Sequence, residues 1–200
     1  CFCFTECIIL LLQVLQRKTK DKIILGIDPG TNITGYGLIR IAGAEPELIV
    51  VGVIELSKYN DHYLKLKHIF ERTIAIIDEY HPDELAIEAP FYGKNVQSML
   101  KLGRAQGAAI SAALSRSLPI FEYAPRTIKM SITGQGSASK EQVASMLMSI
   151  LSFNEKGIIL DATDGLAAAL CHFYQSGLPS VQKSYSNWKD FMKKNPGRIR

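Results

Sequence analysis

Hydrophobic and polar positions divide the chain into short apolar runs and longer stretches with helical spacing. The apolar runs predict strands over residues 23–27, 34–41, 47–55, 84–88 and 119–123. Helical spacing predicts helices over 61–80, 95–118, 127–132, 139–151 and from 161 through 174. The first three strands follow one another across turn residues, which favours an antiparallel meander. We therefore expect an α/β domain with a mixed five-stranded sheet, the meander plus two further strands, flanked by helices.

The first predicted strand carries the most informative pattern in the chain. Residues 23–27 are almost all apolar, which is typical of a strand buried on both faces, and Asp28 follows directly. A carboxylate at the end of a rigid central strand is well placed to bind a cation. Three nearby glycines are expected to allow a tight turn and the close approach of a large ligand: Gly30, Gly35 and Gly37. By itself, this motif fits either a metal site for phosphodiester chemistry or a phosphate-binding loop.

Three further carboxylates occur at similar places. Glu88 ends a short strand, so its side chain meets that of Asp28 if the two strands are neighbours. Asp161 and Asp164 open the last helix and, three residues apart, share one helical face. Helix capping or a salt bridge would explain each of these acids alone. Agreement among three segments favours an oxygen-rich cluster that suits Mg²⁺, with two ions flanking a displacement at phosphorus.

Charge is unevenly distributed along the chain, whose formal net charge is +4. Residues 94–140 contain seven Lys and Arg residues and one acid, Glu122. This block predicts a polyanionic partner, with a solvated helix face as the alternative. Lys94, Lys101 and Arg104 are spaced to share one helix face that would follow a DNA backbone.

The ends of the chain differ from its centre. Of the four cysteines, three lie within the first seven residues, so no disulfide framework is expected and a reducing compartment is favoured. The apolar run at 7–12 is too short to span a membrane, and basic residues follow it instead of preceding it. We expect residues 1–21 to be an extension outside the domain, either disordered or artefactual, with an apolar docking segment as the alternative. The domain itself is expected over 22–176, followed by a basic tail over 177–200.

Four motifs together resemble those of the RuvC family of crossover junction endodeoxyribonucleases, which have a ribonuclease-H-like fold. From about Lys22 to about Gln175 they occur in the order of that family: Gly26-Ile27-Asp28-Pro29-Gly30 with Thr34-Gly35-Tyr36-Gly37, then Glu88-Ala89-Pro90-Phe91-Tyr92-Gly93-Lys94-Asn95, then Gly134-Gln135-Gly136-Ser137-Ala138-Ser139-Lys140, and finally Asp161-Ala162-Thr163-Asp164-Gly165-Leu166-Ala167. One departure is Arg104-Ala105-Gln106-Gly107, where the family pattern has its basic residue two places later.

The resemblance implies a Mg²⁺-dependent, structure-selective endonuclease that resolves four-way (Holliday) DNA junctions by paired phosphodiester hydrolysis in recombination and repair. It implies these roles: Asp28, Glu88, Asp161 and Asp164 as catalytic metal-binding acids, Lys129 and Lys140 as contacts to the strand near the cut, and Phe91 as a stacking platform for an unpaired base. It also implies two Mg²⁺ ions per site with Mn²⁺ as a substitute, a homodimer, the RuvA–RuvB branch-migration complex as a partner, and a cytoplasmic location without a membrane partner.

Two other classes of function fit the sequence less well than a nuclease. An actin-like kinase or ATPase would need a second phosphate loop, an adenosine motif and about twice this length. A non-catalytic nucleic-acid scaffold on the same fold would be expected to lose acids from the cluster, yet all four are present. His172 lies eleven residues after Asp161, about 16 Å along a helix, so a packing or surface role is expected for it.

Overall fold

The computed structural model describes residues 21–43, 45–90, 95–153 and 160–177. Its strands are β1 (Lys22–Asp28), β2 (Ile33–Ala42), β3 (Glu45–Glu55), β4 (Glu84–Glu88) and β5 (Ile120–Tyr123). Its helices are α2 (His62–Tyr80), α3 (Val96–Ser115), α4 (Pro125–Thr133), α5 (Lys140–Ile150) and α6 (Leu160–Gly177). Every predicted strand and helix is confirmed, with its ends shifted by a few residues.

The five strands form one mixed sheet in the order β3-β2-β1-β4-β5. β1, β2 and β3 pair antiparallel, which confirms the meander, whereas β4 runs parallel to both β1 and β5. Pro46 was expected to lie in the connection but pairs with Ile41 at the start of β3. A proline is tolerated there because β3 is an edge strand, so the missing amide hydrogen breaks no interior ladder.

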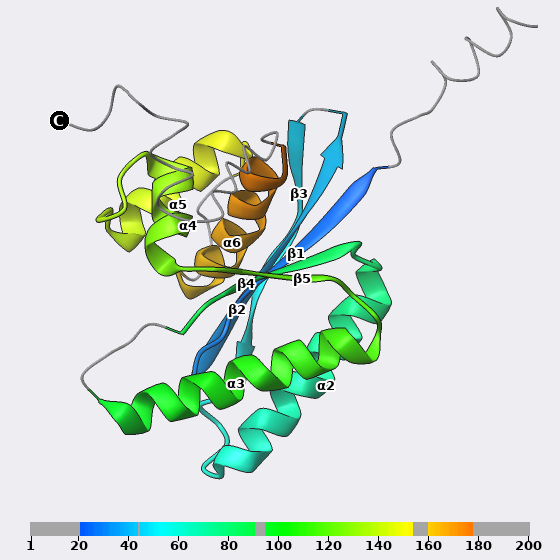
Figure 1. Cartoon of the computed structure of the whole chain (residues 1–200), viewed down its shortest axis with the longest axis vertical. Coiled ribbons are helices and arrows are strands. Elements are labelled where there is room, and N and C mark those ends of the chain that lie inside the picture. The colour runs from blue at the N-terminus through cyan, green and yellow to red at the C-terminus, as the bar shows by residue number, and fades with distance from the viewer. Residues whose placement is uncertain (1–20, 44, 91–94, 154–159, 178–200) are drawn as a thin grey trace, which may run out of the picture.

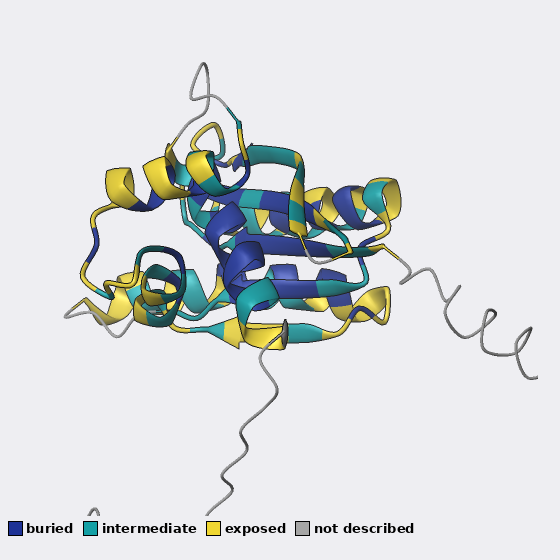
Figure 2. Ribbon diagram, turned by 90° about the horizontal axis from the view of Figure 1, so that it is seen from above, coloured by how far each residue is buried: buried dark blue, intermediate teal, exposed yellow. Residues whose placement is uncertain are grey.

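Helices cover both faces of the sheet, α2 and α3 on one side and α4, α5 and α6 on the other (Figure 1). The strand β1 divides its side chains between the two cores. Ile24 packs toward α6, and Leu25 and Ile27 pack toward α2 and α3; all three are fully buried. Figure 2 shows this burial concentrated in the central strands between the helical layers. The prediction that β1 is buried on both faces is therefore confirmed.

The glycines of β1 and β2 allow α6 to lie directly on the sheet. A Cβ atom on Gly35 would lie 1.9 Å from the carbonyl oxygen of Asp161, and one on Gly26 would lie 2.1 Å from that of Gly165. Gly165 in turn faces the backbone of Gly35 and Tyr36. The expectation that Gly35 admits a large ligand is thus wrong, because a helix backbone fills that space.

Gly30 has the role that its position predicts, a tight turn after β1. A Cβ atom there would lie 1.8 Å from the carbonyl oxygen of Ile33. The hydroxyl of Thr34 accepts a hydrogen bond from the Gly30 amide over 3.2 Å, and the amide of Leu56 donates to the Asn32 carbonyl over 2.8 Å. The turn between β1 and β2 is therefore held in one conformation next to the end of β1.

No helix in the described ranges is long and apolar enough to cross a membrane.

Candidate active site

Two of the predicted acids meet because their strands are parallel neighbours. Ile27 of β1 is in register with Ile87 of β4, so the next residues, Asp28 and Glu88, emerge side by side at the same edge of the sheet. Both side chains are partly buried. The prediction that Asp28 and Glu88 meet if their strands are neighbours is therefore confirmed, because β1 and β4 pair directly.

The remaining two acids come from the first turns of α6. The ammonium nitrogen of Lys140 lies 3.1 Å from Oδ1 of Asp161 and 2.6 Å from Oδ2 of Asp164. Both carboxylates therefore face the same point in space, as their spacing of three residues predicts. Lys140 reaches them from the first position of α5, whose start is stabilised by a capping box between Ser139 and Gln142.

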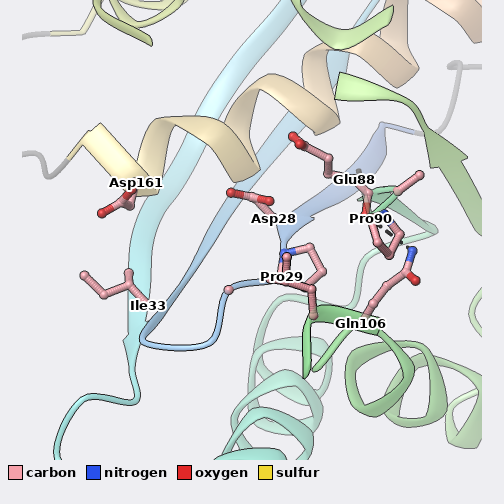
Figure 3. A pocket seen from close by; sticks show the side chains of 10 residues that line it. Asp28, Pro29, Ile33, Glu88, Pro90, Gln106 and Asp161 are labelled. Carbon is pink, nitrogen blue, oxygen red and sulfur yellow. Dashed lines mark hydrogen bonds between the residues drawn. The ribbon is translucent and has the colours of Figure 1, made fainter. Parts of the chain in front are cut away.

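A cavity of about 260 Å³ lies at this edge of the sheet. The side chains of Asp28, Glu88 and Asp161 line it, and in the view of Figure 3 Asp28 lies between the other two. The turn after β1 and the residues after β4 supply apolar walls, through Pro29 and Pro90. Carboxylates from three separate segments thus border one cavity that is open to solvent on one side.

The electrostatics of this edge reflect unbalanced negative charge. Burial, then repulsion from Asp164, raises the pKa of Asp28 to about 6, although Lys140 opposes the shift. Burial and the neighbouring Asp28 raise the pKa of Glu88 to about 8. Burial lowers the pKa of Lys140, but the two α6 carboxylates outweigh this and raise it above its usual range. Shifted pKa values of neighbouring ionisable groups at one cavity are typical of functional sites.

The donor set fits a hard cation. All four acids are oxygen donors of the kind that Mg²⁺ prefers, and the Lys140 ammonium already shows that a cation is accommodated between Asp161 and Asp164. As placed, no three Asp, Glu, His or Cys side chains of the described segments converge closely enough to hold a metal ion. The acids therefore supply suitable oxygen donors. To bind a metal ion, their side chains would have to move closer together and the Lys140 ammonium would have to leave the space between Asp161 and Asp164.

Gln106 is a site residue that the sequence reasoning missed. It is 8% exposed, and its amide nitrogen donates to the backbone carbonyl of Glu88 over 3.3 Å and to Oε2 of Glu122 over 3.1 Å. The side chain lines the cavity beneath Glu88 (Figure 3). In the sequence, position 106 differed from the family pattern because that pattern has a basic residue there, and no role followed for the glutamine itself. The available signal was a buried polar residue on the apolar face of a predicted helix.

Those of the predicted DNA-binding lysines and arginine that the structure describes do not gather at one place as the acids do. Lys129 on α4 lies near enough to lower the pKa of Glu88, and its ammonium donates to the Ala138 carbonyl over 2.8 Å. Lys101 and Arg104 are exposed on α3. The expectation that Lys94 shares a helix face with these two residues stays a prediction. Phe91 and Lys94 themselves lie outside the described residues.

His172 is buried far along α6 and takes no part in the acidic cluster. Its Nδ1 atom lies 2.6 Å from the hydroxyl of Tyr123, and its Nε2 atom contacts the carboxylate of Glu84. The ring also stacks on Phe121, with 4.3 Å between ring centroids. The predicted packing role is confirmed, with a hydrogen-bonded pairing that the sequence did not reveal.

The family model and the curated proteins that match this chain carry the same family name. The family model for "Crossover junction endodeoxyribonuclease RuvC" matches residues 24–172. A curated protein of that name from Bacteroides fragilis is 64% identical over 186 residues, 92% of this chain and 99% of its own length. Another from Cytophaga hutchinsonii is 62% identical over 183 residues, covering 92% of this chain and 90% of its own length.

Solved structures agree with these sequence matches. The structure of T. thermophilus RuvC in complex with a Holliday junction substrate has a TM-score of 0.68 and 28% sequence identity to this chain. That match covers 78% of this chain and 95% of the other. A second Thermus thermophilus RuvC structure has a TM-score of 0.69 and 30% identity, covering 77% and 95%. The expected ribonuclease-H-like fold is confirmed.

Proposed function

The chain belongs to the RuvC family of crossover junction endodeoxyribonucleases, and we propose that Asp28, Glu88, Asp161 and Asp164 are its catalytic, metal-binding residues. It is a nuclease of the class that resolves Holliday junctions in recombination and repair. One observation supports the residue assignment above the others. Three segments distant in sequence bring their carboxylates to a single cavity at the edge of the sheet.

Nucleases of this family depend on metal ions, and we assign Mg²⁺ to this chain, two ions per site with Mn²⁺ as a substitute. Bound divalent ions supply Lewis-acid stabilisation of the charge on the attacking and leaving oxygens of a phosphodiester. In the view of Figure 3, Asp28 lies between Asp161 and Glu88, a position from which it could contribute to holding both ions. Burial and repulsion between the carboxylates raise the pKa values of Asp28 and Glu88, and a bound divalent cation would favour their charged forms.

Two lysines are suited to the substrate phosphates. Lys140 pairs with both Asp161 and Asp164, and its ammonium could donate to an oxygen of a phosphate bound beside these acids. Lys129 lies close enough to Glu88 to oppose the rise in its pKa and presents a second positive charge. Gln106 holds the backbone of Glu88 in place through its hydrogen bond. These residues orient the scissile phosphate and offset its charge.

We extend the proposal to the DNA and protein partners. Phe91 follows Glu88 by three residues and is assigned to stacking on an unpaired base, while Lys94, Lys101 and Arg104 are assigned to the DNA backbone. A homodimer would place one site on each of two strands of like polarity. The RuvA–RuvB branch-migration complex is the proposed protein partner, and the cytoplasm, where such DNA is found, is the proposed location.

The test is cleavage of a synthetic four-way junction, compared with a duplex of matched sequence, with and without Mg²⁺. We expect paired nicks in the junction alone, which a ligase can seal, and no nicks when EDTA replaces the metal. Cleavage that persists in EDTA would contradict the metal assignment. Equal cutting of junction and duplex would contradict selectivity for structure.

A further inference from the structure

A second cavity, of about 350 Å³, lies beside the acidic one and carries the opposite charge. It is enclosed by the turn after β1, the start of α2 and the start of α3. Its polar lining includes Thr31, Asn32, His62, Lys65, Ser98 and Lys101. Leu102 lines both cavities, and the turn over residues 29–33 separates them. None of its lining residues is acidic.

Lys65 is the central cation of this second cavity. Its ammonium donates to the Thr31 carbonyl over 2.9 Å and to Oδ1 of Asn32 over 3.0 Å. An ammonium has three N–H donors, so one remains available. The half-buried side chain therefore holds a positive charge at a fixed position against the turn that follows Asp28.

His62 supplies a second group that lacks a partner. Its Nε2 atom is buried and has no hydrogen-bond partner in the part of the chain that the structure describes. Burial, followed by the charges of Arg104, Lys101 and Lys65, lowers the pKa of this histidine. Three cations therefore act on one ring. The nearby Asp61, whose carboxylate caps α2 by accepting from the Tyr63 amide, opposes them and is the smallest of these influences.

The two helices add to this positive potential. α2 begins at His62 and α3 at Val96, with Ser98 in its first turn, and neither first turn contains an acid. Helix N-termini carry partial positive charge and favour anions, above all phosphate. Here they support a cavity already lined by lysines and an unsatisfied histidine.

We propose that this second cavity is a phosphate subsite. It binds the backbone phosphodiester that is adjacent, on the same junction strand, to the phosphodiester being cut. Lys65 and Lys101 supply the charge, and His62 and Ser98 supply hydrogen bonds. The inference rests on the proposed function, because the acidic cavity must hold the scissile phosphate. The subsite would fix the register of the strand on the acids, since two adjacent phosphates held at two points cannot slide.

The experiment measures junction binding in EDTA, where no cleavage occurs, over a range of salt concentrations. Lys65→Gln is compared with Lys67→Gln, its matched control two positions along α2, where the side chain is 68% exposed and pairs with Glu71. We expect Lys65→Gln to reduce the log–log salt slope by about one for each bound protomer and Lys67→Gln to leave it unchanged. Lys65→Arg keeps the charge and should keep most of the slope.

Phosphate-ethylation interference separates contact from simple support of the turn. With wild-type protein, ethylation of one phosphate beside the cut should block binding, and with Lys65→Gln that block should disappear while the others remain. A slope and interference pattern identical to those of Lys67→Gln would overturn the subsite, even if cleavage slows. A wild-type protein that shows no selective junction binding would instead overturn the proposed function on which it rests.

Discussion

At the scale of single residues, the proposed metal ligands are expected to separate catalysis from binding. Asp161→Asn keeps the size of the side chain but removes the charge, so cleavage of a four-way junction should be lost. Junction binding should persist or strengthen, because one less carboxylate faces the phosphates. Gel-shift and nicking assays on the same preparation measure both properties. Cleavage that survives in Asp161→Asn, and likewise in Asp28→Asn and Glu88→Gln, would contradict the assignment of these acids.

Lys140 is also a single residue with two competing roles. Because its ammonium occupies the space between Asp161 and Asp164, it competes with a metal ion for those carboxylates. Lys140→Met should therefore tighten Mn²⁺ binding to the free protein, by up to about fivefold, since a partly exposed ion pair contributes at most about 1 kcal/mol. The same variant should cleave junctions more slowly, because a phosphate contact is lost. Mn²⁺ titration followed by electron paramagnetic resonance measures the first effect.

The control for this prediction is Lys58→Met, which removes an exposed lysine whose ammonium lies over the ring of Tyr59. It should leave both Mn²⁺ affinity and the cleavage rate unchanged. If Lys140→Met bound Mn²⁺ more weakly than wild type, Lys140 would be supporting the carboxylates instead of competing for them.

At the scale of elements, the site depends on the contact between α6 and the sheet. Gly35→Ala would place a Cβ atom, whose position the β2 backbone fixes, 1.9 Å from the backbone carbonyl oxygen of Asp161. Helix α6 must then move away from β2, which should cost about 1–3 kcal/mol or more in the free energy of unfolding. Cleavage should fall further than stability alone explains, because Asp161 and Asp164 move with the helix.

Gly103→Ala is the matched substitution, because a Cβ atom there meets nothing within 4 Å. Since alanine favours helix, this change in α3 should raise the free energy of unfolding by about 0.5–1 kcal/mol. Denaturant unfolding measures both variants. If Gly35→Ala were as stable as wild type, the close approach of α6 would not be the feature that positions its acids.

At the scale of the whole molecule, the acidic cluster sets how stability depends on pH when metal is chelated. The pKa values of Asp28 and Glu88 are raised to about 6 and about 8 in the folded protein, from their ordinary values of 3.8 and 4.5. The folded state therefore binds more protons than the unfolded state across this window. The free energy of unfolding should fall as pH rises from about 4 to about 8 and then level off.

Glu88→Gln removes the larger of these two contributions. It should raise the melting temperature at pH 8 in EDTA and flatten the dependence on pH, whereas Glu45→Gln on the exposed edge strand should change neither. Thermal melts between pH 4 and pH 9 test this. Stability that increased with pH through this range would show that the two carboxyl groups are not protonated more readily in the folded protein.

Much of the fold and of the acidic cluster could be predicted from the sequence. Short apolar runs and helical spacing reflect local chain geometry, so the strands and helices were predicted within a few residues of their ends. Asp28 and Glu88 were recognised because each ends a strand, and Asp161 and Asp164 because both lie at the start of the last helix. The helix face expected for Lys94, Lys101 and Arg104 stays a prediction, because Lys94 lies outside the described residues.

The sequence by itself thus determined the order of elements, the meander and the segments that carry the acids, since hydrophobic period and strand-ending residues act over a few neighbours. Tertiary structure alone decided which distant groups meet. Gly35 touches Asp161, Gln106 reaches Glu88, and Lys65 is held against the turn after β1. These contacts join segments 18 to more than 100 residues apart. They depend on how helices pack across a sheet, and no local pattern records that packing.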